Sequence, residues 1–599
     1  MKKRSVLLFF LLFTVLPCAA DPVDALRATE VARAFFQNDH NVALRLAPLQ
    51  RVERVSAPLT KAGEEQVPFY IFNRGGGGFV LVAADDACNP ILGYSFTHSF
   101  GQGDDMPDGL AAWLDDLEEQ VALAREATVA ERQQALPKWE AVFVRTKAGE
   151  NGYQPAVKHE TAEWGQKDPF NRLAPTIGGK KAVSGCVPLA MSMLARFFRY
   201  PAAGTGTMPG YSYTSDAGTV QAIEGYTLGE PYRWDKMKMR YTESFTEEEA
   251  AAVAQLVYDC GVMVQAQFDS TTSANTFTMA TKAIEFLGYD AGAVGYYRSY
   301  FSDEQWLSML QRELQEHPVL YTARRDGGGH SFLVDGYDER GFLSVNWGWS
   351  GKSNGYYALS AFSPSADRQY VLKHGSVFGL KPDAGGDPVE YLYLYSGTSS
   401  AGVTYKGLEP LGEIIPRQAF SMKVGGICNG GTTYFEGQFI LALTDAEGKI
   451  KDFVSGAQYY DVTKPRNWRG YASVSCVLNT YPAPGDEIRG FYRSAQWADD
   501  DWRPFYYDHS DGTVGAIAVY DKQTLAEATD FSYNKVLKSV TINTKDHVTW
   551  SLKSSSGAAV SDVVSYSGVQ MVIDATSLKG SYILTLERDG DKMSLTLKF

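Results

Sequence analysis

Cysteine is scarce in this chain, and its pattern does not suggest metal binding. The 599 residues contain six cysteines, at positions 18, 88, 186, 260, 428 and 476. None forms a C-x-x-C pair or the Cys/His spacing of a structural zinc site, so we expect no metal centre and no cofactor. Cys428 and Cys476 lie in one downstream region, where they are candidates for a disulfide.

The chain also lacks basic clusters and long apolar segments. Its net charge is −14, and no Lys/Arg run follows the first residues, which argues against nucleic-acid and anionic-membrane binding. The apolar run at residues 6–16 is too short to span a bilayer. It follows a basic segment and precedes Cys18-Ala19-Ala20, so residues 1–20 are predicted to be a signal peptide.

Export would place the cysteines of the mature protein in an oxidising compartment. We expect the mature protein to be secreted or held at the cell surface, with lipid attachment at Cys18 as the alternative. Loss of the leader leaves an odd number of cysteines, so at least one thiol has no intramolecular partner in an oxidising compartment. Cys186 is our candidate for that free thiol.

Residues 21–150 are predicted to form a separate α+β domain. Residues 25–37 have helical spacing, and 69–73 and 79–83 have the pattern of a hairpin, in which glycines 75–78 form a turn rather than a phosphate-binding loop. Residues 107–136 are predicted to be one long helix whose acidic positions, 115, 116, 118 and 119, form a solvated face. The connector at 147–152 marks a boundary that a protease can reach.

Two further regions follow. Residues 151–383 mix helices, expected at 244–265, 275–287 and 303–316, with strands from residue 318 onward. The Pro/Gly-rich segment 381–388 is the clearest linker. Beyond it, alternating apolar residues predict all-β, immunoglobulin-like modules at 384–530 and 531–599. The acidic run at 499–501 lacks an ordered ligand spacing and is interpreted as a solvated loop rather than a calcium site.

Cys186 is the candidate nucleophile. It follows Gly185 and begins an apolar run with helical spacing, in which Pro188 falls in the first turn. At a helix N-terminus, the dipole and the unpaired N–H groups favour the thiolate, and the same groups can hold an oxyanion. A small buried hydrophobic cysteine is the plainer interpretation, so the assignment depends on a histidine partner.

His330 has the setting of that partner. Glycines precede it, an apolar strand follows, and a turn then leads into a second strand that ends at Asn346. This hairpin places Asn346 near His330, where its amide would fix the imidazole, while Trp347 would shield that bond. A structural hairpin with a solvent-facing histidine is the alternative. Upstream, the amide of Gln166 can donate to an oxyanion.

In this order, the pieces resemble the streptopain family of papain-like cysteine peptidases. The matching stretches are Trp-Gly-Gln-x-x-Pro-Phe-Asn at 164–171, Gly-Cys-Val-Pro-Leu-Ala-Met at 185–191, Gly-Gly-His-Ser-Phe-Leu-Val-Asp-Gly-Tyr at 328–337 and Asn-Trp-Gly-Trp-Ser-Gly at 346–351. The resemblance implies a papain-like catalytic domain. In it Cys186 is the nucleophile, His330 the general base and acid, Gln166 an oxyanion donor, and Asn346 and Trp347 the supports of the histidine.

The resemblance covers about residues 25–383, and within it residues 69–125 are similar to the family's inhibitory pro-segment. It implies a secreted zymogen of a cysteine endopeptidase that cleaves proteins or peptides with an apolar residue near the scissile bond. Pro188 and the segment 270–273, which is less glycine-rich than expected, depart from the family pattern and leave the subsites open.

Two other functions stay open, as does the role of the C-terminus. A thiol acyltransferase would use the same fold with an amine as acceptor, and a surface adhesin would bind through the β modules without catalysis. The last strands, at 578–599, look like the C-terminal sorting domain of type IX secretion substrates, which implies outer-membrane secretion machinery as a partner. An ordinary terminal hairpin is the alternative.

Overall fold

The computed structural model describes residues 22–52, 60–61, 64–65, 67–101, 106–144, 153–325, 328–362, 374–480, 482–498, 501–508, 512–519, 529–534, 539–544, 549–558, 565–566, 570–574, 576–588 and 591–599. The predicted signal peptide and the connector at 147–152 lie outside these residues. The chain divides into two compact units, Met1–Asp387 and Pro388–Phe599. In the described parts, no helix combines the length and hydropathy needed to cross a membrane, and no cluster of three or more His, Cys, Asp or Glu residues is placed to hold a metal ion.

One sheet of eleven strands organises the first unit. Its order is β1-β4-β5-β6-β18-β17-β16-β15-β19-β14, and β7 pairs with β16. The strands are β1 (Leu49–Val52), β4 (Phe69–Arg74), β5 (Phe79–Ala83), β6 (Ile91–Ser95), β7 (Pro155–Lys158), β14 (Val294–Tyr297), β15 (Val319–Arg325), β16 (Gly328–Asp338), β17 (Leu343–Asn346), β18 (Gly355–Tyr357) and β19 (His374–Phe378). Because Tyr94 of β6 lies opposite Tyr356 of β18, the N-terminal strands extend the sheet of the domain that follows.

The N-terminal domain has three helices, α1 (Ala25–Phe36), α2 (Asp108–Ala124) and α3 (Val129–Phe143). The prediction of one helix over 107–136 was wrong. Thr128 and Glu131 form a capping box, in which the Thr128 hydroxyl accepts from the Glu131 N–H and the Glu131 carboxylate accepts from the Thr128 N–H. Such a box satisfies the first free N–H groups of a helix, so a new helix begins at Val129. The predicted hairpin of β4 and β5 is confirmed.

The middle region contains the expected helices together with short hairpins. The helices are α4 (Cys186–Phe198), α5 (Glu247–Met263), α6 (Thr278–Leu287) and α7 (Asp303–Leu314), with short 3-10 turns η3 (Trp234–Lys236) and η4 (Arg298–Tyr300). The hairpins are β8 (Thr176–Ile177) with β9 (Lys180–Lys181), β10 (Thr207–Met208) with β13 (Tyr226–Thr227), and β11 (Tyr211–Thr214) with β12 (Val220–Ile223). The N-terminal domain adds the 3-10 turn η1 (Val42–Leu44) and the hairpin of β2 (Thr60–Lys61) with β3 (Glu64–Glu65).

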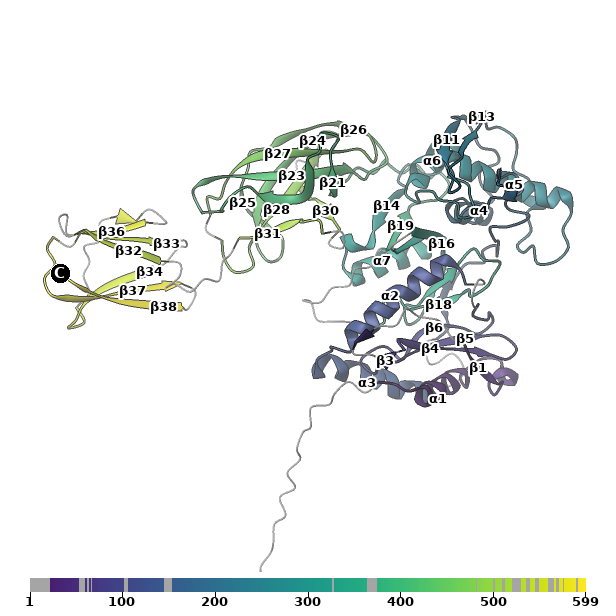
Figure 1. Ribbon diagram of the computed structural model, residues 1–599, viewed down its shortest axis with the longest axis horizontal. Helices are drawn as coiled ribbons and strands as arrows, with labels where there is room; N and C mark the ends of the chain where they lie inside the picture. Colours follow the sequence, from purple (N-terminus) through teal and green to yellow (C-terminus); the bar gives the residue numbers. More distant parts are fainter. Residues whose placement is uncertain are drawn as a thin grey trace, which may run out of the picture. The chain divides into compact units, whose positions relative to one another are not determined.

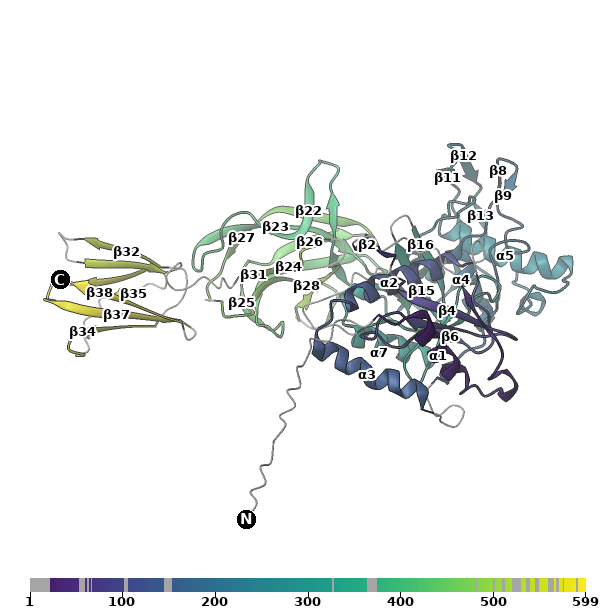
Figure 2. The same cartoon turned by 60° about the horizontal axis from the view of Figure 1, so that its bottom comes forward.

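Two hydrophobic cores lie on opposite faces of β15 and β16. Tyr321 and Phe332 belong to one core, which they share with Trp113 of α2. Leu320 and Leu333, their neighbours along the strands, belong to the other core, which is built around α4 and α5. Alternate residues of a strand face opposite sides, so α2 covers one face and α4 the other. Figures 1 and 2 show α2 running beside these strands.

The described residues of the second unit form strands and no helix, which together with the first unit confirms the predicted α+β architecture. One six-stranded sheet contains β20 (Leu392–Leu394), β21 (Ser396–Thr398), β22 (Thr404–Pro410), β23 (Ala419–Asn429), β27 (Trp468–Val477) and β30 (Tyr506–Tyr507). A second contains β24 (Phe435–Thr444), β25 (Ile450–Phe453), β26 (Gln458–Thr463), β28 (Glu487–Ser494), β29 (Arg503–Pro504) and β31 (Ala516–Ala518). Smaller sheets contain β32 (Thr529–Asn534), β33 (Ser539–Thr544), β35 (Ser565–Tyr566) and β36 (Gln570–Asp574), and β34 (Thr549–Ser554), β37 (Ser581–Arg588) and β38 (Asp591–Lys598). The finer boundaries near 150 and 530 stay predictions.

The candidate disulfide between Cys428 and Cys476 was wrong. Both residues lie on the β23–β27 ladder, but Cys476 lies opposite Phe420, eight residues along β23 from Cys428. That offset corresponds to roughly 26 Å along a strand, whereas a disulfide needs Cα atoms within about 7 Å. All five described cysteines are free thiols.

Candidate active site

Cys186 is the first residue of α4, and the chain reaches it through a position that favours glycine. Gly185 has φ 90° and ψ 148°, and a Cβ on it would lie 2.7 Å from Cγ2 of Thr272. The Leu189 N–H donates to the Gly185 carbonyl at 3.2 Å, so the helix begins at Cys186. Pro188 lies in the first turn, where its missing N–H costs no helical hydrogen bond. The thiol therefore lies at the positive end of a buried helix.

His330 lies on β16, next to that thiol. It pairs with Ala323 of β15 and is 4% exposed. Burial raises the pKa of the Cys186 thiol, but the charge and hydrogen bond of His330, together with backbone hydrogen bonds from Ser331 and Val187, lower it by more. The net pKa is below that of an ordinary cysteine, so the arrangement favours the nucleophilic thiolate.

We expect a small alkylating reagent such as iodoacetamide to modify Cys186 selectively in the native protein. Cys186 is partly exposed, whereas the other described cysteines are buried. The thiolate is the reacting form, so the alkylation rate should fall as the pH drops through a midpoint below the usual value of about 8.5. In His330→Ala the charge that lowers the pKa is lost and burial remains, so the midpoint should rise above that value.

The pH midpoint of Cys186 alkylation is measured in the parent and in His330→Ala. Each protein is alkylated for set times at a series of pH values, and its tryptic peptides are quantified by mass spectrometry. His40→Ala is the matched control, because His40 is an exposed histidine of the N-terminal domain. An unchanged midpoint in His330→Ala would show that His330 does not act on the thiol.

A backbone hydrogen bond joins Gln166 to the same site. The Ser184 N–H donates to the Gln166 carbonyl at 3.0 Å, which connects the loop before Cys186 to the Gln166 segment. Gln166, Cys186, His330 and Trp349 line one cavity of about 260 Å³. A side-chain amide in that cavity is suited to donate to an oxyanion formed on a carbonyl that Cys186 attacks.

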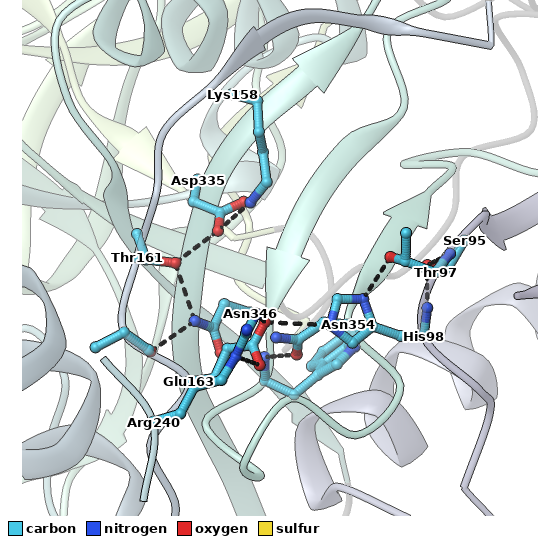
Figure 3. Close-up of polar contacts among 12 residues, drawn as sticks. Ser95, Thr97, His98, Lys158, Thr161, Glu163, Arg240, Asp335, Asn346 and Asn354 are labelled. Carbon is cyan, nitrogen blue, oxygen red and sulfur yellow. Dashed lines mark hydrogen bonds and ion pairs between the residues drawn. The ribbon is translucent and has the colours of Figure 1, made fainter. Parts of the chain in front are cut away.

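Asn346 is buried at the end of β17 and holds a different segment. Its amide nitrogen donates to Oγ1 of Thr161 at 3.0 Å and to the Ala162 carbonyl at 2.9 Å (Figure 3). The Thr161 hydroxyl donates in turn to the Asp335 carboxylate at 2.7 Å. The amide nitrogen therefore holds the segment before Gln166, and the predicted bond between Asn346 and His330 stays a prediction.

Trp347 lies in the hydrophobic core beside Phe332, whereas Trp349 lies near the His330 ring. Trp347 is fully buried, donates its indole N–H to the Ser353 carbonyl at 3.0 Å and packs on Phe332 with ring centroids 4.6 Å apart. The ring of Trp349 lies 6.5 Å from the ring of His330 in an edge-on arrangement. Trp349 was not predicted as a site residue, although the Trp-Gly-Trp spacing was a signal that a second ring lies near the histidine.

The N-terminal domain contacts the His330 side of this site through α2. A Cβ on Gly109 would lie 2.6 Å from Cδ2 of His330 and 3.0 Å from Cδ1 of Phe332. Further along α2, Trp113 donates its indole N–H to the Ala358 carbonyl at 3.0 Å. Helix α2 therefore lies directly against the imidazole of His330.

A buried contact between a carboxylate and an imidazole joins α2 to β19. One oxygen of Asp116 lies 2.7 Å from Nε2 of His374, whose Nδ1 is hydrogen-bonded to the Tyr321 hydroxyl at 3.0 Å. Asp116 is 8% exposed and His374 is 1% exposed, so the predicted solvated face was wrong at Asp116. Sequence reasoning missed this pair, because nothing near Asp116 in the chain distinguishes it from the neighbouring acids.

A second charged contact connects the N-terminal domain to the Gln166 segment. Glu163, three residues before Gln166, lies 3.1 Å from Nε2 of His98 and accepts from Nε of Arg240 at 2.7 Å (Figure 3). Burial raises the Glu163 pKa, but hydrogen bonds and charges from His98 and Arg240 lower it to about 2. Sequence reasoning singled out none of these three residues.

Comparison with known proteins gives matches for both parts of the first unit. Residues 164–357 match the model of the Peptidase C10 family, and residues 20–121 match that of the Spi protease inhibitor. The thiol protease/hemagglutinin PrtT of Porphyromonas gingivalis is 30% identical over 401 residues, covering 64% of this chain. A streptopain of Streptococcus pyogenes is 28% identical over 318 residues, covering 50% of this chain and 75% of streptopain. The chain spans only 44% of PrtT.

Two solved structures from Prevotella intermedia are also similar. A prointerpain A fragment is 25% identical with a TM-score of 0.44, covering 56% of this chain and 99% of the fragment. Active interpain A cysteine protease is 30% identical with a TM-score of 0.34, covering 40% of this chain and all of that one.

Proposed function

Because residues 164–357 belong to the peptidase C10 family and residues 20–121 to the Spi protease inhibitor family, we propose that the chain is the exported zymogen of a cysteine endopeptidase. The observation that carries the proposal is the pairing of Cys186 with His330. The thiol lies at a helix N-terminus, next to the one group whose charge and hydrogen bond lower its pKa most. A nucleophile with an adjacent base is the arrangement that covalent acyl transfer requires.

The proposed reaction has two steps. The Cys186 thiolate attacks the scissile carbonyl, and the Gln166 amide and the Cys186 N–H stabilise the oxyanion. His330 then protonates the leaving amine as the tetrahedral intermediate collapses to a thioester. In the second step His330 takes a proton from water, which attacks the thioester and releases the carboxylic acid and the thiol. Asn346 and Trp347 would support the imidazole once α2 has left.

The N-terminal domain would act as the inhibitor of this reaction. Support comes from α2, which lies against His330 at Gly109, and from the shared core of Trp113, Tyr321 and Phe332. Activation would follow cleavage of the chain between the domains. Because β7, which begins at Pro155, pairs with β16, a cut before Pro155 would leave β7 with the catalytic domain.

Export would use the leader predicted at residues 1–20. The C-terminal strands β37 and β38 form a regular antiparallel hairpin from Ser581 to Lys598. That hairpin fits either the proposed sorting signal for outer-membrane secretion machinery or an ordinary terminal module. Fusing residues 531–599 to a periplasmic reporter and measuring its release into the medium separates these roles.

The test of the proposed function starts with the purified protein lacking residues 1–20. Incubation under reducing conditions should give a product that has lost the N-terminal domain, seen by intact mass, together with hydrolysis of casein. A parallel reaction with added primary amine tests the acceptor. If amide products replaced the acids, the protein would be an acyltransferase.

If the purified protein does not process itself, an external protease is added to cut the connector at 147–152. Casein hydrolysis after that cut would still support the peptidase. Absence of hydrolysis from the trimmed protein would overturn the proposal and favour a binding protein.

A further inference from the structure

A second cavity, of about 470 Å³, lies beside Cys186, and polar and apolar surface contribute about equally to its lining. It shares Cys186 with the cavity that holds Gln166, but it extends toward α6, β14 and β15 instead. Hydroxyl and amide groups share its wall with apolar side chains, and its lining includes one charged side chain, that of Arg324. We call it the Arg324 pocket, with Cys186, Gln267, Tyr297, Thr322, Arg324 and Ser331 among the residues that form it.

Arg324 is exposed at this pocket and has a weak partner. One guanidinium nitrogen donates to the Tyr297 hydroxyl at 3.5 Å, at the long limit for a hydrogen bond. Among the described residues, no carboxylate forms an ion pair with Arg324. A guanidinium that faces a cavity with only a neutral partner is suited to bind a carboxylate, since its planar donors match the two carboxylate oxygens.

Three hydroxyl groups of the pocket already have hydrogen-bond partners. The hydroxyls of Thr276 and Ser331 are 2.6 Å apart, and the Thr322 hydroxyl donates to the His330 carbonyl at 3.1 Å. Among the described residues of this lining, Arg324 is the one with a charged side chain, and its hydrogen-bond partner is the neutral Tyr297 hydroxyl.

The register of β15 and β16 places Arg324 close to His330. Arg324 lies opposite Gly329, and Ala323 lies opposite His330. A Cβ on Gly329 would lie 3.0 Å from Cγ of Arg324, so the arginine stem packs closely on the residue before the histidine. A side chain bound by Arg324 therefore belongs to a substrate residue close to the bond that Cys186 attacks.

We infer that Arg324 is a specificity-determining residue and that the Arg324 pocket binds an acidic side chain of the peptide substrate near the scissile bond. The inference rests on the proposed peptidase function. It differs from the apolar preference that the family resemblance implies. The acidic chain, with a net charge of −14, would thus present a local positive charge at its substrate cleft.

The experiment uses the full chain after self-processing. Cleavage of a mixed peptide library, read by mass spectrometry, locates the substrate position at which acidic residues are enriched. Matched fluorogenic peptides with Glu, Gln or Leu at that position then give kcat/KM. We expect the Glu peptide to exceed the Gln peptide by roughly tenfold or more, the effect of a hydrogen-bonded charge. Molar salt should reduce that ratio.

Variants assign the effect to one side chain. Arg324→Gln should remove the preference for Glu over Gln, and Arg324→Glu should reverse the preference toward a Lys peptide. Arg312→Gln is the matched control, because Arg312 is an exposed arginine on α7 whose loss changes the net charge equally. It should keep the ratio of the parent.

Two results would overturn the inference alone: faster cleavage of the Leu peptide than of the Glu peptide by the parent, or an unchanged ratio in Arg324→Gln. Failure of the parent to cleave any peptide after removal of the N-terminal domain would overturn the proposed function and the inference together. The two failures are therefore distinguishable.

Discussion

The Cys186→Ala variant should keep its N-terminal domain through a long incubation and should lose peptide hydrolysis by roughly 10⁴-fold or more, the scale measured when a catalytic nucleophile is removed. The Cys186 sulfur forms the thioester bond in the proposed reaction, so no neighbouring group can replace it. Its replacement by alanine at the start of α4 preserves the helix, since Gly185 and the Leu189 N–H define that end. Intact mass and peptide hydrolysis, measured side by side with the parent, give both results.

Cys260→Ala is the matched control for the loss of a thiol. Cys260 is a buried residue of α5, and burial raises its pKa to about 12, so it has no thiolate to offer at neutral pH. This variant should process itself and hydrolyse peptides like the parent, with a somewhat lower Tm from the lost core volume. Hydrolysis by Cys186→Ala at the parent's rate would rule out Cys186 as the nucleophile.

The parts of the site that follow from local sequence were predictable. Gly185 before an apolar helical run located Cys186 at a helix N-terminus, and glycines before an apolar strand located His330 on a sheet. In both cases glycines and an apolar pattern next to the residue indicate the local backbone structure. The same reasoning gave the hairpin of β4 and β5, and it failed where a short capping box at Thr128 starts a new helix within the predicted one.

The contacts between the two domains were not predictable in this way. His374 lies far from Asp116 in the chain, and Glu163 lies 65 residues from His98, yet each pair meets across the domain junction. An acidic residue on an amphipathic helix has no local feature that tells whether water or an imidazole will face it. Such pairs depend on the docking of two folded surfaces, which a single sequence does not specify.

Gly109→Val should weaken the docking of the N-terminal domain by about 5- to 150-fold, the equivalent of about 1–3 kcal/mol for overpacking a tight contact. The first added carbon would lie 2.6 Å from the His330 ring and 3.0 Å from Phe332, and valine adds two methyl groups beyond it. Because β15 and β16 hold His330 in a paired strand, α2 is the part that moves.

The measurement is made in the Cys186→Ala background, where self-processing does not interfere. After an external protease cuts the connector at 147–152, size-exclusion chromatography at several concentrations gives the Kd of the N-terminal domain. Ala111→Val, at a partly exposed position of the same helix, introduces the same side chain without the contact and should leave the Kd near that of the parent. In the Cys186-containing protein, Gly109→Val should then process faster than the parent. Slower processing with an unchanged Kd would mean that α2 does not restrain His330, and the inhibition would have to arise from the other contacts of the domain, such as the pair of Asp116 with His374.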